Sequence, residues 1–235
     1  MINIKKPLVI AHRGASVDAY ENSKEAFQLA IKQNADMIEL DTHLTEDGYF
    51  VIYHDPIIKF QGKKYIISRT KLETIQSILL PNKETIPLLE DVLKQMLPKI
   101  MFNIEIKCRI VGKVFDELLS RVGGDNSRII VSSFKRDVLF NLKNSKMGYS
   151  LAFLCFHKSL RTRQMVKYEF IDAINPFYKL LRNNHVKFYH ENNKKVFTWT
   201  VNDEEIIRNL IAKNIDGIIT DIPLKARNIV QSYLE

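Results

Sequence analysis

Met37-Ile38-Glu39-Leu40-Asp41 is a short strand-like run in which apolar and acidic residues alternate. Side chains alternate across a strand, so Glu39 and Asp41 share one face while Ile38 and Leu40 share the other. The aliphatic face is expected to pack on helices, which leaves the acidic face pointing inward. A strand of this kind fits a parallel barrel, because polar side chains at the carboxyl ends of barrel strands build the active face.

Similar apolar runs alternate with helical patterns along the rest of the chain, which is typical of βα units around a parallel sheet. The further strands are expected at residues 8–11, 101–106, 128–133, 148–154, 173–176, 195–201 and 217–220. Helices are expected at residues 22–33, 90–97, 137–143 and 204–213, the first with Asn22 as N-cap and Glu25 completing a capping box. Eight such strands in 235 residues predict an α/β fold, a TIM (β/α)8 barrel, as a single domain over residues 1–235.

One segment departs from the βα pattern directly after the second strand. Thr45-Glu46-Asp47-Gly48 is a tight-turn signal, so Phe50–His54 should return antiparallel to the strand and bring His54 to about the height of Asp41. The apolar residues within 56–71 add to this insertion. We therefore expect a small hairpin or loop insertion after strand two.

Composition sets the broad class. Hydrophobic residues make up 46% and charged residues 26%, as in ordinary globular proteins, and no run is long and apolar enough to span a bilayer. The first residues carry no apolar leader region, which predicts a cytoplasmic protein without stable membrane insertion. Cys108 and Cys155 are expected to be free thiols. The net charge of +8 favours an anionic substrate, but the lysines look scattered, which argues against nucleic acid.

Acidic residues at the strand ends predict a metal site. Glu105 closes the 101–106 strand, so it should meet Glu39 and Asp41 at the barrel mouth. Three carboxylates cannot all remain ionised side by side unless a cation holds them. Hard oxygen ligands without cysteine favour Mg²⁺ or Ca²⁺ over zinc.

Two histidines are placed near these acids by the same strand argument. His12 follows the first strand and His54 ends the returning arm, and two imidazoles suit acid–base catalysis near neutral pH. The alternative is that one of them lies only in the outer surroundings of the metal site, or is a core residue. His43 is expected to point to the other face and to be structural. The remaining histidines are expected at the surface: His157, His185 and His190.

Two cations flank the same mouth. Arg13 is suited to bidentate contacts with a phosphate, and Lys107 adds a mobile positive charge. Gly14 allows a tight bend just after the strand.

A series of motifs resembles that of the glycerophosphodiester phosphodiesterases and runs in order through nearly the whole chain. The motifs are His12-Arg13-Gly14, Glu21-Asn22-Ser23, Ala35-Asp36-Met37-Ile38-Glu39-Leu40-Asp41, Leu44-Thr45-Glu46-Asp47-Gly48, His54-Asp55, Glu105-Ile106-Lys107, Ser133-Phe134, Trp199-Thr200-Val201-Asn202 and Asp216-Gly217-Ile218-Ile219-Thr220-Asp221-Ile222-Pro223. The resemblance implies a TIM barrel with His12 and His54 as the acid–base pair. It implies metal binding by Glu39, Asp41 and Glu105, and substrate binding by Arg13, Lys107, Phe134 and Trp199.

The chain departs from the family pattern at three places. Tyr20 replaces a proline, Asn34 replaces a glycine, and Ile67-Ser68-Arg69-Thr70-Lys71 stands where a threonine-asparagine-glycine stretch is expected. Asn34 tolerates the left-handed conformation, so its change is mild. The third departure lies on the leaving-group side and leaves the alcohol of the substrate open.

The sequence thus predicts metal-dependent hydrolysis of small glycerophosphodiesters to glycerol 3-phosphate and an alcohol. The nucleophile can be water or the glycerol hydroxyl of the substrate. A rival activity is a lysophospholipase D or phospholipid cyclase, with Phe60 and Tyr65 seating an acyl chain. A rival of another class is a non-catalytic barrel that binds phosphodiesters or a protein. The sequence leaves the oligomeric state open.

Overall fold

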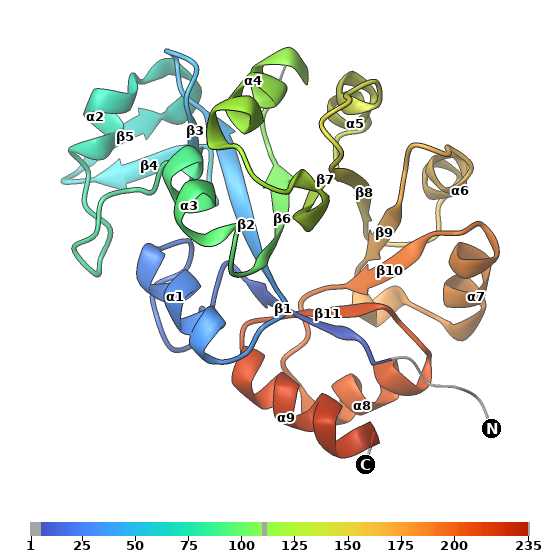
Figure 1. Cartoon of the computed structure of the whole chain (residues 1–235). Coiled ribbons are helices and arrows are strands. Elements are labelled where there is room, and N and C mark those ends of the chain that lie inside the picture. The colour runs from blue at the N-terminus through green and yellow to red at the C-terminus, as the bar shows by residue number, and fades with distance from the viewer. Residues whose placement is uncertain (1–5, 110–111, 235) are drawn as a thin grey trace.

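The computed structural model describes residues 6–109 and 112–234 and contains a closed parallel barrel (Figure 1). Its eight strands are β1 (Leu8–His12), β2 (Met37–Leu44), β6 (Met101–Ile106), β7 (Ile129–Ser133), β8 (Ser150–Cys155), β9 (Ala173–Pro176), β10 (Lys195–Thr198) and β11 (Gly217–Thr220). Each strand pairs in parallel with the next, and β1 pairs with both β2 and β11, which closes the ring. The predicted TIM barrel is confirmed.

Helices surround the barrel between its strands (Figure 1). They are α1 (Lys24–Lys32), α3 (Leu89–Met96), α4 (Gly112–Val122), α5 (Arg136–Leu142), α6 (Leu160–Val166), α7 (Asn183–Glu191), α8 (Glu204–Ala212) and α9 (Pro223–Leu234). Ile38, Leu40, Ile104 and Ile106 belong to the main core together with helical residues, as the alternation along the strands predicts. No helix among the described residues has both the length and the apolar character needed to cross a bilayer.

The barrel interior holds a second, smaller core. It consists of inward-facing residues of successive strands: Ile10, Met37, Ile130, Ala152, Ala173, Phe197 and Ile219. Further along the same inward faces stand the polar residues of the mouth. The registers pair His12 with Glu39 and Asp41 with Glu105, so the polar ends of β1, β2 and β6 are level with one another.

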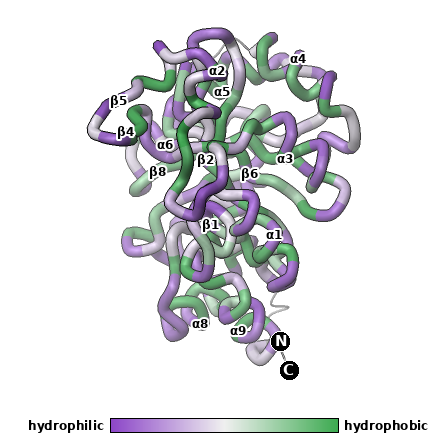
Figure 2. Tube along the Cα trace, turned by 90° about the vertical axis from the view of Figure 1, so that its left-hand side faces the viewer, coloured by the Kyte–Doolittle hydropathy of each residue, from purple (hydrophilic) through white to green (hydrophobic). Residues whose placement is uncertain are grey.

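The insertion after the second strand has the predicted antiparallel arm. β3 (Phe50–Ile52) pairs with Thr42–Leu44, and the amide of Tyr53 donates to the carbonyl of Asp41 at 3.0 Å. A hairpin of β4 (Ile57–Phe60) and β5 (Lys63–Ile66), with α2 (Leu72–Gln76), forms a separate cluster. This hairpin projects from the barrel on the side away from the termini and mixes hydrophilic and hydrophobic residues (Figure 2).

The start of α1 differs from the prediction. The N-cap is Ser23, whose hydroxyl accepts the Ala26 amide at 3.0 Å, so the capping box of Asn22 and Glu25 is wrong. Asn22 instead has a φ of 55° in the left-handed region that asparagine tolerates. The predicted strand 195–201 also ends early, at Thr198.

Candidate active site

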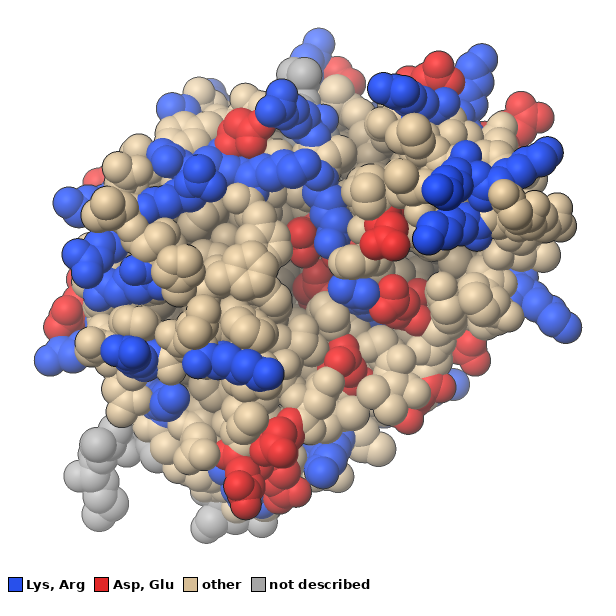
Figure 3. Space-filling view, turned by 180° about the vertical axis from the view of Figure 1, so that it is seen from behind, with Lys and Arg blue, Asp and Glu red and all other residues tan. Residues whose placement is uncertain are grey.

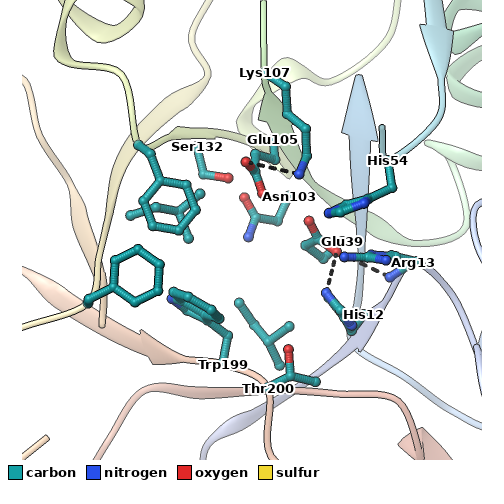
Figure 4. A pocket seen from close by; sticks show the side chains of 14 residues that line it. His12, Arg13, Glu39, His54, Asn103, Glu105, Lys107, Ser132, Trp199 and Thr200 are labelled. Carbon is teal, nitrogen blue, oxygen red and sulfur yellow. Dashed lines mark hydrogen bonds and ion pairs between the residues drawn. The ribbon is translucent and has the colours of Figure 1, made fainter. Parts of the chain in front are cut away.

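The mouth of the barrel contains a cavity of about 220 Å³ (Figure 4). Acidic and basic side chains lie along one side of it and aromatic side chains along the other. The lining residues are His12, Arg13, Glu39, His54, Asn103, Glu105, Lys107, Ser132, Phe134, Leu154, Phe156, Trp199, Thr200 and Ile219. Eight of the nine predicted site residues are among them, and the ninth, Asp41, contacts two of them.

Glu39, Asp41 and Glu105 come together as predicted. One carboxylate oxygen of each lies within 4.8 Å of the others. Burial, with repulsion from Asp41 and Glu105, raises the pKa of Glu39 well above its usual value. Burial also raises the pKa of Glu105, to about 7, against the opposing attraction of Lys107. Two of the three acids therefore resist ionisation unless positive charge lies close to them, so a nearby cation would favour their charged forms.

Asp41 behaves differently from its two neighbours. Burial opposes its ionisation, yet Lys107 and Arg13 together with an Asn22 hydrogen bond bring its pKa below the usual value. Lys107 Nζ lies 3.1 Å from Asp41 Oδ1, Arg13 Nε lies 3.0 Å from Oδ2, and the Asn22 amide donates to Oδ2 at 2.9 Å. The role of Asn22 was missed, because the sequence presented it as a helix cap.

The turn after β1 places Arg13. Gly14 has a φ of 85°, and a Cβ there would lie 2.7 Å from the backbone of Ala26, so only glycine fits against α1. Arg13 itself has a φ of 55°, and its amide donates to Glu39 at 3.1 Å. Its guanidinium also pairs with Glu21 at 2.7 Å. Arg13 thus links Glu39 and Asp41 to Glu21 at the edge of the mouth.

His12 is held by a carboxylate from the last loop of the barrel. Its Nδ1 lies 2.6 Å from Asp221 Oδ1, and Asp221 also accepts hydrogen bonds from Asn202 at 2.6 Å and Ser16 at 3.0 Å. Burial would raise the pKa of Asp221, but the His12 and Asn202 hydrogen bonds outweigh it and lower the pKa to about 2. An ionised carboxylate only accepts, so Nδ1 of His12 donates and Nε2 faces the site, 3.9 Å from Glu39.

His54 is held in a similar way from the insertion. Its Nδ1 lies 2.8 Å from Asp55, and its carbonyl oxygen accepts from Nε2 of His43 at 3.1 Å. The prediction that His43 points to the other face is wrong: it is two residues beyond Asp41 and therefore shares its face. Burial lowers the pKa of His43, which favours the neutral ring that supports His54.

An aromatic wall of Phe134, Phe156 and Trp199 faces the acids, and Phe177 packs against two of its rings, Phe156 and Trp199. Phe134 and Phe156 are stacked with centroids 5.4 Å apart, and Trp199 meets each of them edge-on at 5.5 Å. The indole of Trp199 donates to the Asn175 carbonyl at 2.8 Å, which fixes the ring. Phe134 and Trp199 were predicted to line the pocket and do so, whereas Phe156 carried no motif signal.

The predicted acyl-chain contacts lie elsewhere. Phe60 and Tyr65 pack on the cluster of the insertion, and the hollow beside Phe60 is lined by residues such as Tyr20, Tyr53 and Ile78. None of the predicted site residues lines that hollow. The apolar surface that adjoins the cavity is the aromatic wall.

Buried amide and hydroxyl groups line the inner part of the cavity. Asn103 is fully buried, and both polar atoms of its side chain lack a partner among the described residues, as does the hydroxyl of Ser132. Unpartnered buried groups are costly unless water or a ligand satisfies them. Both residues line the cavity, so they offer hydrogen bonds to a hydroxyl-bearing ligand.

The mouth combines an acidic cluster, two imidazoles and an apolar wall, and this combination suits a small anionic ester. A parallel barrel with such a mouth is typical of the TIM-barrel phosphodiesterases. The chain belongs to the glycerophosphoryl diester phosphodiesterase family, whose sequence model matches residues 12–225.

Individual relatives agree over nearly the full length. A glycerophosphodiester phosphodiesterase of Caldanaerobacter subterraneus subsp. tengcongensis is 34% identical over 96% of this chain and 98% of its own. Lysophospholipase D GDPD1 of Homo sapiens is 24% identical over 95% of this chain and 86% of its own. A phosphodiesterase of Oleispira antarctica, solved with its product sn-glycerol-3-phosphate, superposes with a TM-score of 0.87 at 22% identity, over 96% of this chain and 97% of that one.

Proposed function

We propose that this phosphoric diester hydrolase cleaves glycerophosphodiesters to glycerol 3-phosphate and an alcohol. The observation that carries the proposal is the pair of imidazoles beside the acidic cluster, each with Nδ1 bonded to a carboxylate. The relative from Caldanaerobacter subterraneus bears this activity in its name, and the Oleispira antarctica enzyme was solved with glycerol 3-phosphate as product.

His12 and His54 are the proposed acid–base pair. Because each Nδ1 is bonded to an aspartate, Nε2 is the atom of each ring that can exchange a proton with the substrate. One ring accepts the proton of the attacking hydroxyl, and the other donates a proton to the leaving oxygen. Both water and the glycerol hydroxyl fit this scheme as nucleophile.

Glu39, Asp41 and Glu105 are the proposed ligands of a divalent cation. Their oxygens form a compact set of hard donors, which suits Mg²⁺ or Ca²⁺. When bound, the cation would neutralise phosphate charge and polarise its oxygens. The raised pKa values of Glu39 and Glu105 support the assignment: burial and repulsion between the carboxylates raise them, and a bound cation would oppose both effects.

Arg13, Lys107, Phe134 and Trp199 are the proposed substrate contacts. The two cations lie beside Asp41 and can turn part of their charge toward a phosphate. The aromatic wall faces them across the cavity, so it would receive the glycerol or the alcohol part. Asn103 and Ser132 can bind a glycerol hydroxyl.

The test is a panel of glycerophosphodiesters, including glycerophosphocholine and glycerophosphoethanolamine, assayed with Mg²⁺, Ca²⁺ or EDTA. We expect glycerol 3-phosphate, identified by ³¹P NMR, to form only with metal present. His12→Asn and His54→Asn should each lower turnover by about 10²-fold or more, whereas His157→Asn, an exposed control, should not. Binding of these diesters without any turnover would support the non-catalytic rival instead.

Lysophospholipids are a second candidate substrate class. The aromatic wall continues the cavity toward solvent at Phe156, and the human relative is named a lysophospholipase D. A bound acyl chain should raise kcat/KM steadily with its length, since each buried CH₂ contributes about 0.8 kcal/mol. Phe156→Ala should flatten that dependence, whereas Phe60→Ala should not. A flat dependence in the unmodified protein would restrict the activity to small diesters.

A further inference from the structure

The positive charge of the chain is concentrated in one segment. Residues 134–190 hold eleven lysines and arginines against three acidic residues, so this segment accounts for the whole net charge of +8. The basic residues are scattered along the chain, but acidic residues balance them outside this segment, so the excess of positive charge is local. Figure 3 shows basic side chains gathered on the side of the central hollow where α5, α6 and α7 lie.

Seven of these basic residues follow the carboxyl ends of β7, β8 and β9, at the mouth of the barrel or in the next helical turns. They are Lys135, Arg136, Lys158, Arg161, Arg163, Lys179 and Arg182. Within residues 6–109 and 112–234, none of the seven forms an ion pair with an acidic side chain. Their charge is therefore open to an external anion.

The same loops expose apolar side chains. Phe156 is 56% exposed, Leu160 is 79% exposed and Leu180 is 47% exposed. Phe156 also stacks on Phe134 of the cavity wall, so the exposed apolar surface is continuous with the active site. We call these three apolar residues and the seven basic ones the basic–apolar rim.

We propose that the basic–apolar rim docks on an anionic phospholipid surface. Lysines and arginines near such a surface each contribute attraction to its phosphates, and exposed aromatic and leucine side chains gain by entering the boundary between headgroups and acyl chains. A nucleic acid would use the charge but has no place for two exposed leucines, since its bases stack on aromatic and not aliphatic side chains.

Docking would bring lipid substrates to the active site. The cavity opens beside Phe156, so a lysophospholipid in the surface could slide along the aromatic wall toward the acids. This delivery rests on the proposed function, whereas the docking itself requires no turnover.

The experiment is co-sedimentation with phosphatidylcholine vesicles, with and without phosphatidylglycerol, at low and high ionic strength. We expect binding that requires phosphatidylglycerol and falls with salt. Arg161→Glu with Lys179→Glu should weaken it by at least about 30-fold, the loss expected for two surface cations, because the new carboxylates add repulsion. Lys143→Glu with Lys146→Glu is the matched control, because these exposed lysines follow α5 near the start of β8, at the opposite end of the barrel, and should have much less effect.

Leu160→Ser with Leu180→Ser tests the apolar part and should weaken vesicle binding without changing the charge. Three outcomes would overturn the proposal. The first is an equal loss of vesicle affinity in the Arg161/Lys179 variant and the control variant. The others are unchanged vesicle binding by the leucine variant and displacement of the protein from vesicles by duplex DNA. Turnover of dissolved glycerophosphocholine separates the two proposals. Vesicle binding without that turnover would refute the proposed function and still support docking by the basic–apolar rim.

Discussion

Asp221 Oδ1 lies 2.6 Å from Nδ1 of His12, across 209 residues of sequence. The aspartate fixes the ring so that Nε2 points into the cavity. Asn202 and Ser16 hold the aspartate in turn. His12 is therefore positioned by a network that joins the first strand to the loop after the last.

Replacing Asp221 tests this network. Asp221→Asn keeps the size of the side chain but removes the charge that fixes the His12 ring, so kcat should fall about 10²-fold, at the lower end of what one acid–base group supplies. KM for glycerophosphocholine should change little. Asp137→Asn, an exposed carboxylate on α5, is the control for a lost charge. Steady-state kinetics that show only a raised KM would contradict the positioning role.

The two histidines should act as a unit. His12→Ala and His54→Ala should each lower kcat by about 10²–10⁴-fold while folding survives, since both lie at the solvent-facing mouth. The double variant should lose less than the product of the two factors, because residues in one mechanism are not additive. Near-normal turnover by His54→Ala would remove it from the mechanism.

His43 should matter through His54. His43→Leu removes the donor to the His54 carbonyl, so kcat should fall by about tenfold, less than for His54→Ala. His43→Gln, which can donate from its amide, should restore part of the rate. Equal rates for the leucine and glutamine variants, with equal thermal stability, would show that the hydrogen bond has no role in positioning.

Metal binding should release protons. With a pKa of about 7, Glu105 is partly protonated near neutral pH without metal, and the raised pKa of Glu39 adds to this. Affinity for Mg²⁺ or Ca²⁺ should therefore rise with pH through about 7 and level off only once both carboxylates are ionised without metal. Calorimetry in two buffers of different ionisation enthalpy measures the proton count. Activity that survives exhaustive EDTA dialysis would contradict the metal requirement.

Glu105 should also make the stability of the metal-free protein depend on pH. The pKa of Glu105 is raised from 4.5 to about 7 in the folded state, so the folded protein binds more protons than the unfolded chain in that window. Stability without metal should then decrease as pH rises from about 4.5 to 7. Glu105→Gln should remove this loss. The measurement is thermal unfolding of the unmodified protein and of Glu105→Gln in EDTA, at about pH 5 and about pH 8. Equal pH dependence of the two proteins would show that the pKa of Glu105 is not raised.

Local patterns determined the barrel and most of its mouth. The alternation in residues 37–41 is a local property, and it correctly orients Glu39 and Asp41 against Ile38 and Leu40. The Asp47-Gly48 turn likewise predicted the returning arm that carries His54. His43 could have been placed by the same alternation, since it is two residues beyond Asp41.

Contacts between distant segments were decided only by the tertiary structure. Asn22 has the residue type of a helix cap, and its bond to Asp41 exists because the first βα loop packs over β2. The approach of Asp221 to His12 depends on β1 pairing with β11, and the rim depends on three successive loops sharing one end of the barrel. Hydrophobic periodicity along a segment fixes which of its faces is buried, but closure of the ring determines which distant side chains meet there.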